Sequence, residues 1–304
     1  MILIGENIHI ISKSVREAID NRDEDFIKAL LDAQQNMDCV DLNIGPARKG
    51  SIFEWLVPFV KENSGLNISF DTTNPSEMQL GLELFGENEF NFINSASKDE
   101  ERFDKMTDLA LMQNCNLILL TLDKETGIPK TADGRLEIAF ELYEKALAKG
   151  LESEKLFFDP LVLPLSVDQS QAMEAINTIR MVKESFDPPV KTVVGLSNVS
   201  NGSPKELRSL LNRVFACLAF GAGLDAAIID AKDTELVRVL KMLESGLPQN
   251  ETDKLYIQIA NMIANFGEIS DISYDLASDE EQKIMKAVSV ILGEKIYSHS
   301  FTQV

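Results

Sequence analysis

Short apolar runs alternate with amphipathic segments along most of this chain. The runs are rich in branched side chains, and their length is typical of buried β-strands. They occupy Ile2–Gly5, Cys39–Ile44, Leu66–Phe70, Phe90–Ile93, Leu117–Leu122, Leu156–Phe158, Thr192–Leu196 and Ala226–Ile229. The segments between them repeat apolar residues at helical spacing, which predicts helices over residues 23–36, 53–63, 75–84, 98–113, 136–149, 171–184, 204–220 and 233–243.

This alternation of strands and helices predicts an α/β barrel. Strands that alternate with helices pair in parallel through right-handed crossovers and are buried on both faces. Eight such units within about 250 residues match a closed (β/α)8 TIM barrel. A doubly wound open sheet is the alternative, but the glycine-rich dinucleotide turn after its first strand is absent. We therefore predict a single TIM-barrel domain over residues 1–304.

The segment of about residues 245–282 interrupts this rhythm. It holds an apolar, helix-like stretch at 257–266, and an acidic stretch follows at 275–281. Lys283–Leu292 is then expected to form the C-terminal helix. Because insertions usually settle on the surface, we interpret the segment as a surface insertion before that helix. A flexible lid and a dimer contact are the alternatives.

The composition narrows the class of protein. Hydrophobic residues make up 44% of the chain and charged residues 26%, which is typical of a globular protein with a large core. A formal net charge of −20 disfavours nucleic acid as a partner, because binding phosphates requires clustered Lys and Arg. No apolar stretch approaches the roughly 18 residues of a membrane span, and Met1–Gly5 is too short for a signal peptide. We expect a cytoplasmic protein.

The potential metal ligands are few and scattered. Cys39 and Cys115 fall in strand-like runs, Cys217 falls in a helical pattern, and we interpret all three as buried core thiols. The two histidines, His9 and His299, lie near opposite ends of the chain. No bound metal is therefore expected.

Nearly every apolar run is followed by a carboxylate or a carboxamide. In a TIM barrel the functional groups gather at the carboxyl ends of the strands, which here carry Glu6, Asn7, Asp41, Asn43, Asp71, Asn94, Asp123, Asp159, Ser197, Asn198 and Asp230. Such a set suits a neutral planar heterocycle with N–H donors and C=O acceptors. It lacks the basic cluster that a phosphate would require. Turn formation at Asp41 and Asn43, and helix capping at Asp71, are the simpler explanations for those positions.

Several motifs resemble the pterin-binding methyltransferase family, in particular the methyltransferases that act on 5-methyltetrahydrofolate and a corrinoid/iron–sulfur protein. Asp41-Leu-Asn-Ile-Gly-Pro-Ala47 and Asp159-Pro-Leu161 are shared broadly among pterin-binding barrels, dihydropteroate synthase included. Gly127-Ile-Pro-Lys130 and Gly195-Leu-Ser-Asn-Val-Ser200 are more specific to the methyltransferases. The resemblance covers most of the chain and implies a barrel like that of dihydropteroate synthase.

The resemblance also implies roles for individual positions. Asp71, Asn94 and Asp159 would hydrogen-bond the pterin ring. Asn198 would reach N5, the nitrogen that carries the methyl group, and would be the catalytic residue. Arg208 corresponds to a family arginine near the ligand. The predicted site consists of Glu6, Asp41, Asn43, Asp71, Asn94, Asp159, Asn198 and Arg208.

The implied reaction moves the N5-methyl group of 5-methyltetrahydrofolate to the Co(I) corrinoid of a separate corrinoid/iron–sulfur protein, as in the reductive acetyl-CoA pathway. Because the corrinoid arrives on its partner, the chain needs no metal ligand of its own. An amide does not titrate, so Asn198 would donate a hydrogen bond to N5 that strengthens in the transition state, and water would deliver the proton through a polar network. The resemblance also implies a homodimer.

Other functions stay open at this stage. The same methyl donor would also suit a different corrinoid protein, as in a demethylase system. Dihydropteroate synthase is disfavoured, because the basic residues for a pyrophosphate leaving group are missing. A non-catalytic pterin-binding protein is the alternative outside enzymes, since a shared fold does not guarantee shared chemistry.

Overall fold

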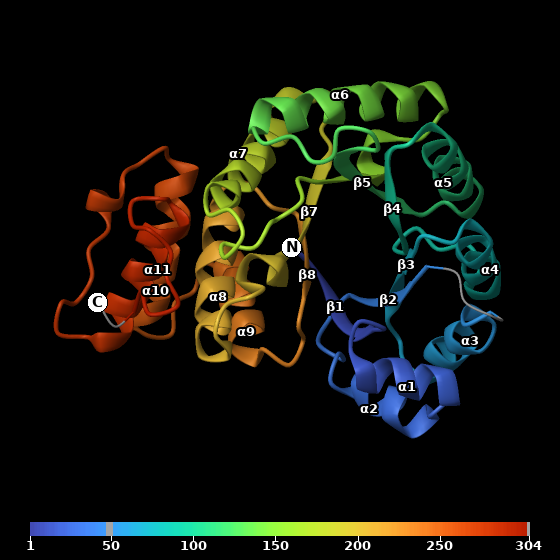
Figure 1. Ribbon diagram of the computed structural model, residues 1–304, viewed down its shortest axis with the longest axis horizontal. Helices are drawn as coiled ribbons and strands as arrows, with labels where there is room; N and C mark the ends of the chain where they lie inside the picture. Colours follow the sequence, from blue (N-terminus) through green and yellow to red (C-terminus); the bar gives the residue numbers. More distant parts are fainter. Residues whose placement is uncertain (47–50, 303–304) are drawn as a thin grey trace.

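The computed structural model describes residues 1–46 and 51–302. Eight parallel strands close into a barrel in the order β1-β2-β3-β4-β5-β6-β7-β8, and helices surround it (Figure 1). The predicted (β/α)8 fold is confirmed. Ala47, the last residue of the first motif quoted above, lies outside the described residues.

The strands are short, and their central residues are buried. They are β1 (Ile2–His9), β2 (Cys39–Gly45), β3 (Asn67–Thr72), β4 (Phe92–Lys98), β5 (Asn116–Asp123), β6 (Leu156–Asp159), β7 (Lys191–Gly195) and β8 (Ala226–Ile229). An apolar cluster built from strand residues alone includes Phe92, Ile118 and Phe157. The rings of Phe92 and Phe157 meet edge to face with their centroids 4.9 Å apart. The barrel interior is therefore a packed core, and the three cysteines are buried and free, as predicted.

The barrel helices lie close to the predicted segments, with one addition. The helices are α1 (Lys13–Asn21), α2 (Glu24–Asp32), α3 (Phe53–Asn63), α4 (Pro75–Phe85), α5 (Glu100–Gln113), α6 (Ala132–Ala148), α7 (Ser170–Ser185), α8 (Lys205–Gly221), α9 (Thr234–Ser245), α10 (Glu251–Ala264) and α11 (Asp279–Ile291). The sequence pattern missed α1, because only Val15, Ala18 and Ile19 of this short polar helix are buried. Within the described ranges, no helix is both long and apolar enough to cross a membrane.

The strand ladders become irregular at their carboxyl ends. The register shifts between Gly5 and Ile8 in β1, between Asn43 and Gly45 in β2, and twice after Asn94 in β4. An extra residue in a ladder re-aims the neighbouring side chains. β1 and β4 also run further than their apolar runs predicted, because polar residues such as Glu6, Asn7 and Ser95 continue these strands.

The segment of residues 245–282 forms part of a packed helical layer. Helix α9 follows β8 and completes the barrel, and Figure 1 shows α10 and α11 stacked beyond α8. A Cβ atom added at Gly221 of α8 would lie 2.1 Å from the carbonyl oxygen of Ala260 in α10. Arg238 of α9 pairs with the buried Asp253 of α10 at 2.7 Å. These contacts disfavour a flexible lid.

Gly221→Ala should destabilise the protein, although alanine is ordinarily the better helix residue. The added methyl group would meet the backbone of α10, and we expect the free energy of unfolding to fall by about 1–3 kcal/mol, as measured by urea unfolding. Gly65 is exposed and has open space around its Cβ position. Gly65→Ala is therefore the control and should change stability by less than about 0.5 kcal/mol. Equal stability of the two variants would contradict the close packing of α10 on α8.

Candidate functional site

The predicted site residues gather at one end of the barrel. All eight strands are parallel, so their carboxyl ends and the loops that follow form a single face, which we call the barrel mouth. Seven of the predicted residues belong to strands or strand ends at this mouth, namely Glu6, Asp41, Asn43, Asp71, Asn94, Asp159 and Asn198. Arg208 lies in the first turn of α8 instead.

Four of them form two adjacent hydrogen-bonded groups across β2, β3 and β4, which together we call the carboxyl network. The amide of Asn43 donates to the carboxylate of Asp71. The Ser69 hydroxyl donates to Asp41 Oδ1 at 2.6 Å, and Asn94 Nδ2 donates to the same oxygen at 3.3 Å. The side-chain amides thus orient both carboxyl groups. Ser69 was not predicted, because a buried serine inside a strand gives no signal in the sequence.

Burial makes the two carboxyl groups of this network hard to ionise. Burial raises the pKa of Asp41 to about 6, despite the hydrogen bonds from Ser69 and Asn94. Burial and then repulsion from Asp41 raise the pKa of Asp71 well above its usual value, and the Arg102 guanidinium partly offsets the rise. Near neutral pH the pair therefore carries fewer than two full negative charges.

Arg102 reaches this network from α5. Its Nε donates to the carbonyl oxygen of Ser95 at 2.8 Å, and its two terminal nitrogens donate to the carbonyls of Thr72 and Thr73 at 3.3 Å each. The arginine therefore ties the end of β3 and the residue after it to β4, while it faces Asp71. The sequence does not indicate this role, because an arginine in an amphipathic helix is usually a solvent-exposed charge.

A ladder irregularity in β1 sets the position of Glu6. Gln34, which follows α2, is buried, and its Oε1 accepts a hydrogen bond from the Asn7 backbone N–H at 3.3 Å. Its Nε2 donates to the Leu30 carbonyl at 3.0 Å. A Cβ atom at Gly5 would lie 2.2 Å from Gln34 Oε1, so the glycine makes room for this contact. The amide of Gln34 therefore fixes the backbone on either side of Glu6.

The Glu6 carboxyl lies among other acidic groups. Burial raises its pKa to about 7, and repulsion from Asp230 and Asp41 adds to the rise. The buried Ser197 hydroxyl faces Glu6 and lowers this pKa in part, although its geometry falls short of a hydrogen bond. Asn7 donates to Asp230 Oδ1 at 2.5 Å and so links the first strand to the residue after the last one. Glu6 is therefore partly protonated near neutral pH.

Asp159 ends β6 and is buried. Its Oδ1 accepts a hydrogen bond from the backbone N–H of Leu161 at 2.7 Å. Burial raises its pKa to about 7, and the Leu161 N–H and the Arg135 guanidinium only partly oppose the rise. The sequence indicated an apolar setting from Phe157 and Phe158, and both are indeed buried. A hydrogen-bonding ligand would therefore stabilise this carboxylate more than water does in the free protein.

Asn198 is exposed on a 3-10 turn, η2 (Leu196–Ser200), that follows β7 directly. Its Oδ1 accepts a hydrogen bond from Asn201 Nδ2 at 3.2 Å, so its Nδ2 is the group available to donate to a ligand. A Cβ atom at Gly195 would lie 2.9 Å from that nitrogen. The glycine at the end of β7 therefore lets the amide lie close to the strand end.

Arg208 is less closely tied to the site. Its side chain is exposed, and its Nε donates to the Ser203 carbonyl oxygen at 2.9 Å. This contact fixes the loop before α8. It does not join Arg208 to the network of carboxyl groups.

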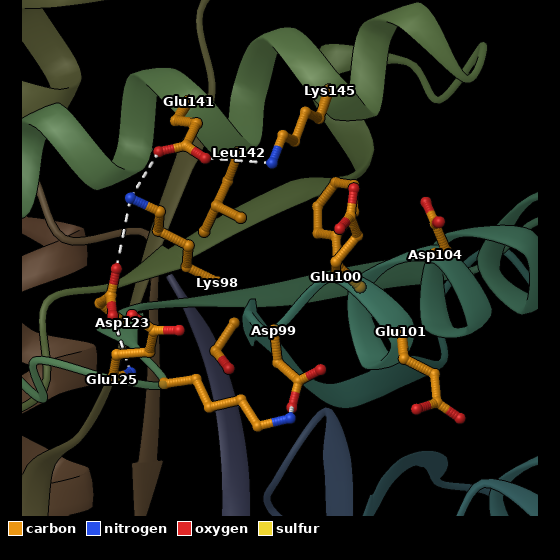
Figure 2. Close-up of a pocket in the computed structure, with 13 residues that line it drawn as sticks. Lys98, Asp99, Glu100, Glu101, Asp104, Asp123, Glu125, Glu141, Leu142 and Lys145 are labelled. Atoms are coloured by element: carbon orange, nitrogen blue, oxygen red, sulfur yellow. Dashed lines mark hydrogen bonds and ion pairs between the residues drawn. The ribbon is translucent and has the colours of Figure 1, made fainter.

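A separate cavity of about 680 Å³ lies outside the barrel between α5 and α6. Figure 2 shows Lys98 between Asp123 and Glu141, with Lys145 on the other side of Glu141. The Lys98 Nζ is 2.8 Å from Glu141 and 3.3 Å from Asp123. These side chains already pair with one another at the surface, so we take the barrel mouth as the better candidate for a ligand site.

The side chains at the barrel mouth are better suited to hydrogen bonding with a ligand than to nucleophilic attack on it. It combines carboxylate and amide groups, which match a planar heterocycle that carries both N–H donors and C=O acceptors. Its carboxyl groups change charge at neutral pH, so they can exchange protons with a bound molecule. Asn198 adds an exposed donor at the edge of the same face.

Two known proteins are similar to this chain in sequence. The methylcorrinoid:tetrahydrofolate methyltransferase of Eubacterium limosum is 26% identical over 264 residues, which are 84% of this chain and 94% of that protein. The methionine synthase of Mycobacterium tuberculosis is 31% identical over 246 residues, which are 76% of this chain but 20% of that longer protein.

A likeness to a solved structure concerns the fold. The dihydropteroate synthase of Yersinia pestis superposes with a TM-score of 0.52 at 13% identity, over 80% of this chain and 93% of that one. Residues 49–230, more than half of the chain, match the family described as pterin binding enzyme. The protein therefore belongs to the pterin binding enzyme family.

Proposed function

We propose that the protein transfers a methyl group between N5 of a tetrahydrofolate and the cobalt of a corrinoid that a separate protein carries. The observation that carries the proposal is the set of carboxyl and amide groups at the barrel mouth, with the exposed Asn198 amide at its edge. The family and the name of the Eubacterium limosum relative support it.

In this proposal the inner residues hold the pterin ring. Asp159 accepts hydrogen bonds from the amino-pyrimidinone edge, which carries N–H donors. Asp71 and Asn94 bind the ring from β3 and β4. Ionised carboxylates are the stronger acceptors, so pterin binding favours loss of the protons that burial retains in the free protein.

The methyl transfer requires a better leaving group at N5. When the methyl carbon leaves for cobalt, which supplies the electron pair of the new bond, the C–N5 pair stays on nitrogen and N5 gains a proton. Asn198 donates a hydrogen bond that strengthens as charge develops at N5. Glu6 and Asp41, with pKa values of about 7 and about 6, are protonated often enough to supply the proton through water.

We further propose a corrinoid/iron–sulfur protein as the partner and a homodimer as the working form. A second candidate is the reverse transfer from a methylated corrinoid protein of a demethylase system. The alignment with the Eubacterium limosum relative covers 94% of that protein, and its name favours transfer from a methylated corrinoid to tetrahydrofolate. Optical assays of cobalt methylation and demethylation with both kinds of corrinoid protein discriminate between the candidates.

The same optical assay tests the proposal through Asn198→Ala. Loss of a transition-state donor should slow methyl transfer by about 10–1,000-fold, while the affinity for methyltetrahydrofolate changes much less. Asn36→Ala is the control, because Asn36 is an exposed asparagine before β2, at the opposite end of the barrel. If the protein methylates no reduced corrinoid and demethylates none, the proposed function is wrong. Wild-type rates in Asn198→Ala alone would remove only the role of that residue.

Gly195→Ala tests whether the position of the amide matters. The backbone φ of Gly195 is −74°, which alanine adopts without strain. The new methyl group would displace Asn198 Nδ2, and we expect methyl transfer to slow by about 10- to 100-fold at nearly unchanged thermal stability. Gly65→Ala serves as the matched control. A variant as active as the wild type would show that Asn198 acts from another position.

Asp159→Asn should separate binding from stability. Because folding raises the pKa of Asp159 from 3.8 to about 7, the stability that the neutral carboxyl contributes is present at acidic pH and is lost as the pH rises to about 7. At about pH 8 the neutral asparagine should therefore raise the melting temperature of the ligand-free protein by at least about 2 °C, with a smaller gain at about pH 5. The same variant should bind methyltetrahydrofolate weakly. Thermal scans check the melting temperature, and equilibrium titration checks the affinity for methyltetrahydrofolate. A lower melting temperature of Asp159→Asn at pH 8 would contradict the raised pKa of Asp159.

A further inference from the structure

Arg135 is a charged side chain with no exposed surface, and it lies next to the candidate site. It belongs to the first turn of α6, which directly follows the loop of residues 127–130. That loop carries the Gly-Ile-Pro-Lys motif after β5. A buried arginine is unfavourable unless its donors and its charge are compensated, so its contacts indicate what it does.

Two side chains hold the 127–130 loop through its carbonyl groups. Arg135 Nε donates to the Pro129 carbonyl oxygen at 3.0 Å, and its Nη2 donates to Gln171 Oε1 of α7 at 2.6 Å. Gln171 Nε2 then donates to the Lys130 carbonyl oxygen at 3.0 Å. Arg135 and Gln171 therefore form a clasp that fixes the loop to α6 and α7.

The charge of Arg135 is shared between two carboxyl groups. Burial lowers its pKa, while Glu174 of α7 and Asp159 of β6 raise it. Glu174 itself accepts a hydrogen bond from the Ala132 N–H at 2.6 Å. Arg135 Nη1 is buried without a hydrogen-bond partner among the described residues. The guanidinium is thus not neutralised by a single close ion pair, and its field reaches Asp159.

Few groups oppose the burial of Asp159. The Leu161 N–H binds its carboxylate from the following loop, and the Thr121 hydroxyl of β5 contacts only its backbone carbonyl. Among the described residues, the charged group that shifts the Asp159 pKa is Arg135 of α6. No other element supplies a cation for this carboxyl within that part of the chain.

We propose that Arg135 is a positioning residue of the barrel mouth, which holds the 127–130 loop in place and brings a buried positive charge toward Asp159. The inference rests on the proposed pterin-binding role of Asp159. It predicts that Arg135 controls the pH range over which the protein binds a pterin, without contact between Arg135 and the ligand.

The direct test follows the Asp159 carboxyl in the ligand-free protein. Carbon-13 NMR of aspartate-labelled protein, assigned with Asp159→Asn, should show a titration midpoint near 7 in the wild type. Arg135→Gln should raise this midpoint by about one unit, the lower end of the effect of a nearby opposite charge. Methyltetrahydrofolate affinity at pH 7 should then fall by about fivefold and recover at higher pH.

Two further variants separate the charge from the clasp. Gln171→Leu retains the Arg135 charge and removes the contact to Lys130, so it should weaken methyltetrahydrofolate binding equally at every pH and leave the midpoint unchanged. Arg135→Lys retains the charge and should give a midpoint close to the wild type with similarly weakened binding. If Arg135→Gln does not fold, Arg135→Lys carries the test: wild-type affinity in that variant would overturn the positioning role.

The outcomes also distinguish this inference from the proposed function. A midpoint that does not move in Arg135→Gln overturns the inference even if the wild type binds methyltetrahydrofolate. If the midpoint moves but the wild type binds no methyltetrahydrofolate, the proposed function fails while the charge effect on Asp159 stands. In the Asp159→Asn background, Arg135→Gln should no longer shift the pH dependence of binding; a persisting shift would assign it to another carboxyl group.

Discussion

The burial of several carboxyl groups at one end of the barrel is the constraint on which this site depends. A carboxylate loses the stabilisation of water when it is buried, so its neutral form becomes favoured unless donors or cations compensate. Glu6, Asp41 and Asp159 have pKa values raised to about 7, about 6 and about 7 by burial. The packed barrel supports this unfavourable arrangement, and the free protein therefore retains protons and acceptors that a ligand rich in N–H groups would engage.

The geometry of the mouth depends on small departures from a regular barrel. Register shifts fall toward the carboxyl ends of β1, β2 and β4, which carry residues of the candidate site. Two glycines supply space for polar groups: Gly5 in β1 admits the Gln34 amide beside Glu6, and Gly195 at the end of β7 admits the amide of Asn198. A bulkier residue at either position would displace the polar group before it changed the fold.

Cations are distributed unevenly around this acidic protein. On the outer rim, lysines such as Lys98 pair with acidic neighbours at the surface (Figure 2), where screening makes ion pairs weak. Further in, the half-buried Arg102 and the buried Arg135 face carboxyl groups of the mouth and also bind loop carbonyls. These two arginines thus combine two tasks, since each guanidinium both binds a loop carbonyl and favours the charged form of a carboxyl group.

The sequence by itself determined the barrel and most of the residues at its mouth. Buried strands require continuous apolar runs, and a parallel barrel collects whatever follows them, so Asp41, Asp71, Asn94 and Asp159 were predictable from local pattern. Tertiary structure alone decided which groups meet. Ser69, Arg102 and Arg135 act across elements distant in sequence, and each has an ordinary local pattern. A pKa shift, likewise, arises from burial and neighbours in space, which no local pattern of residues specifies.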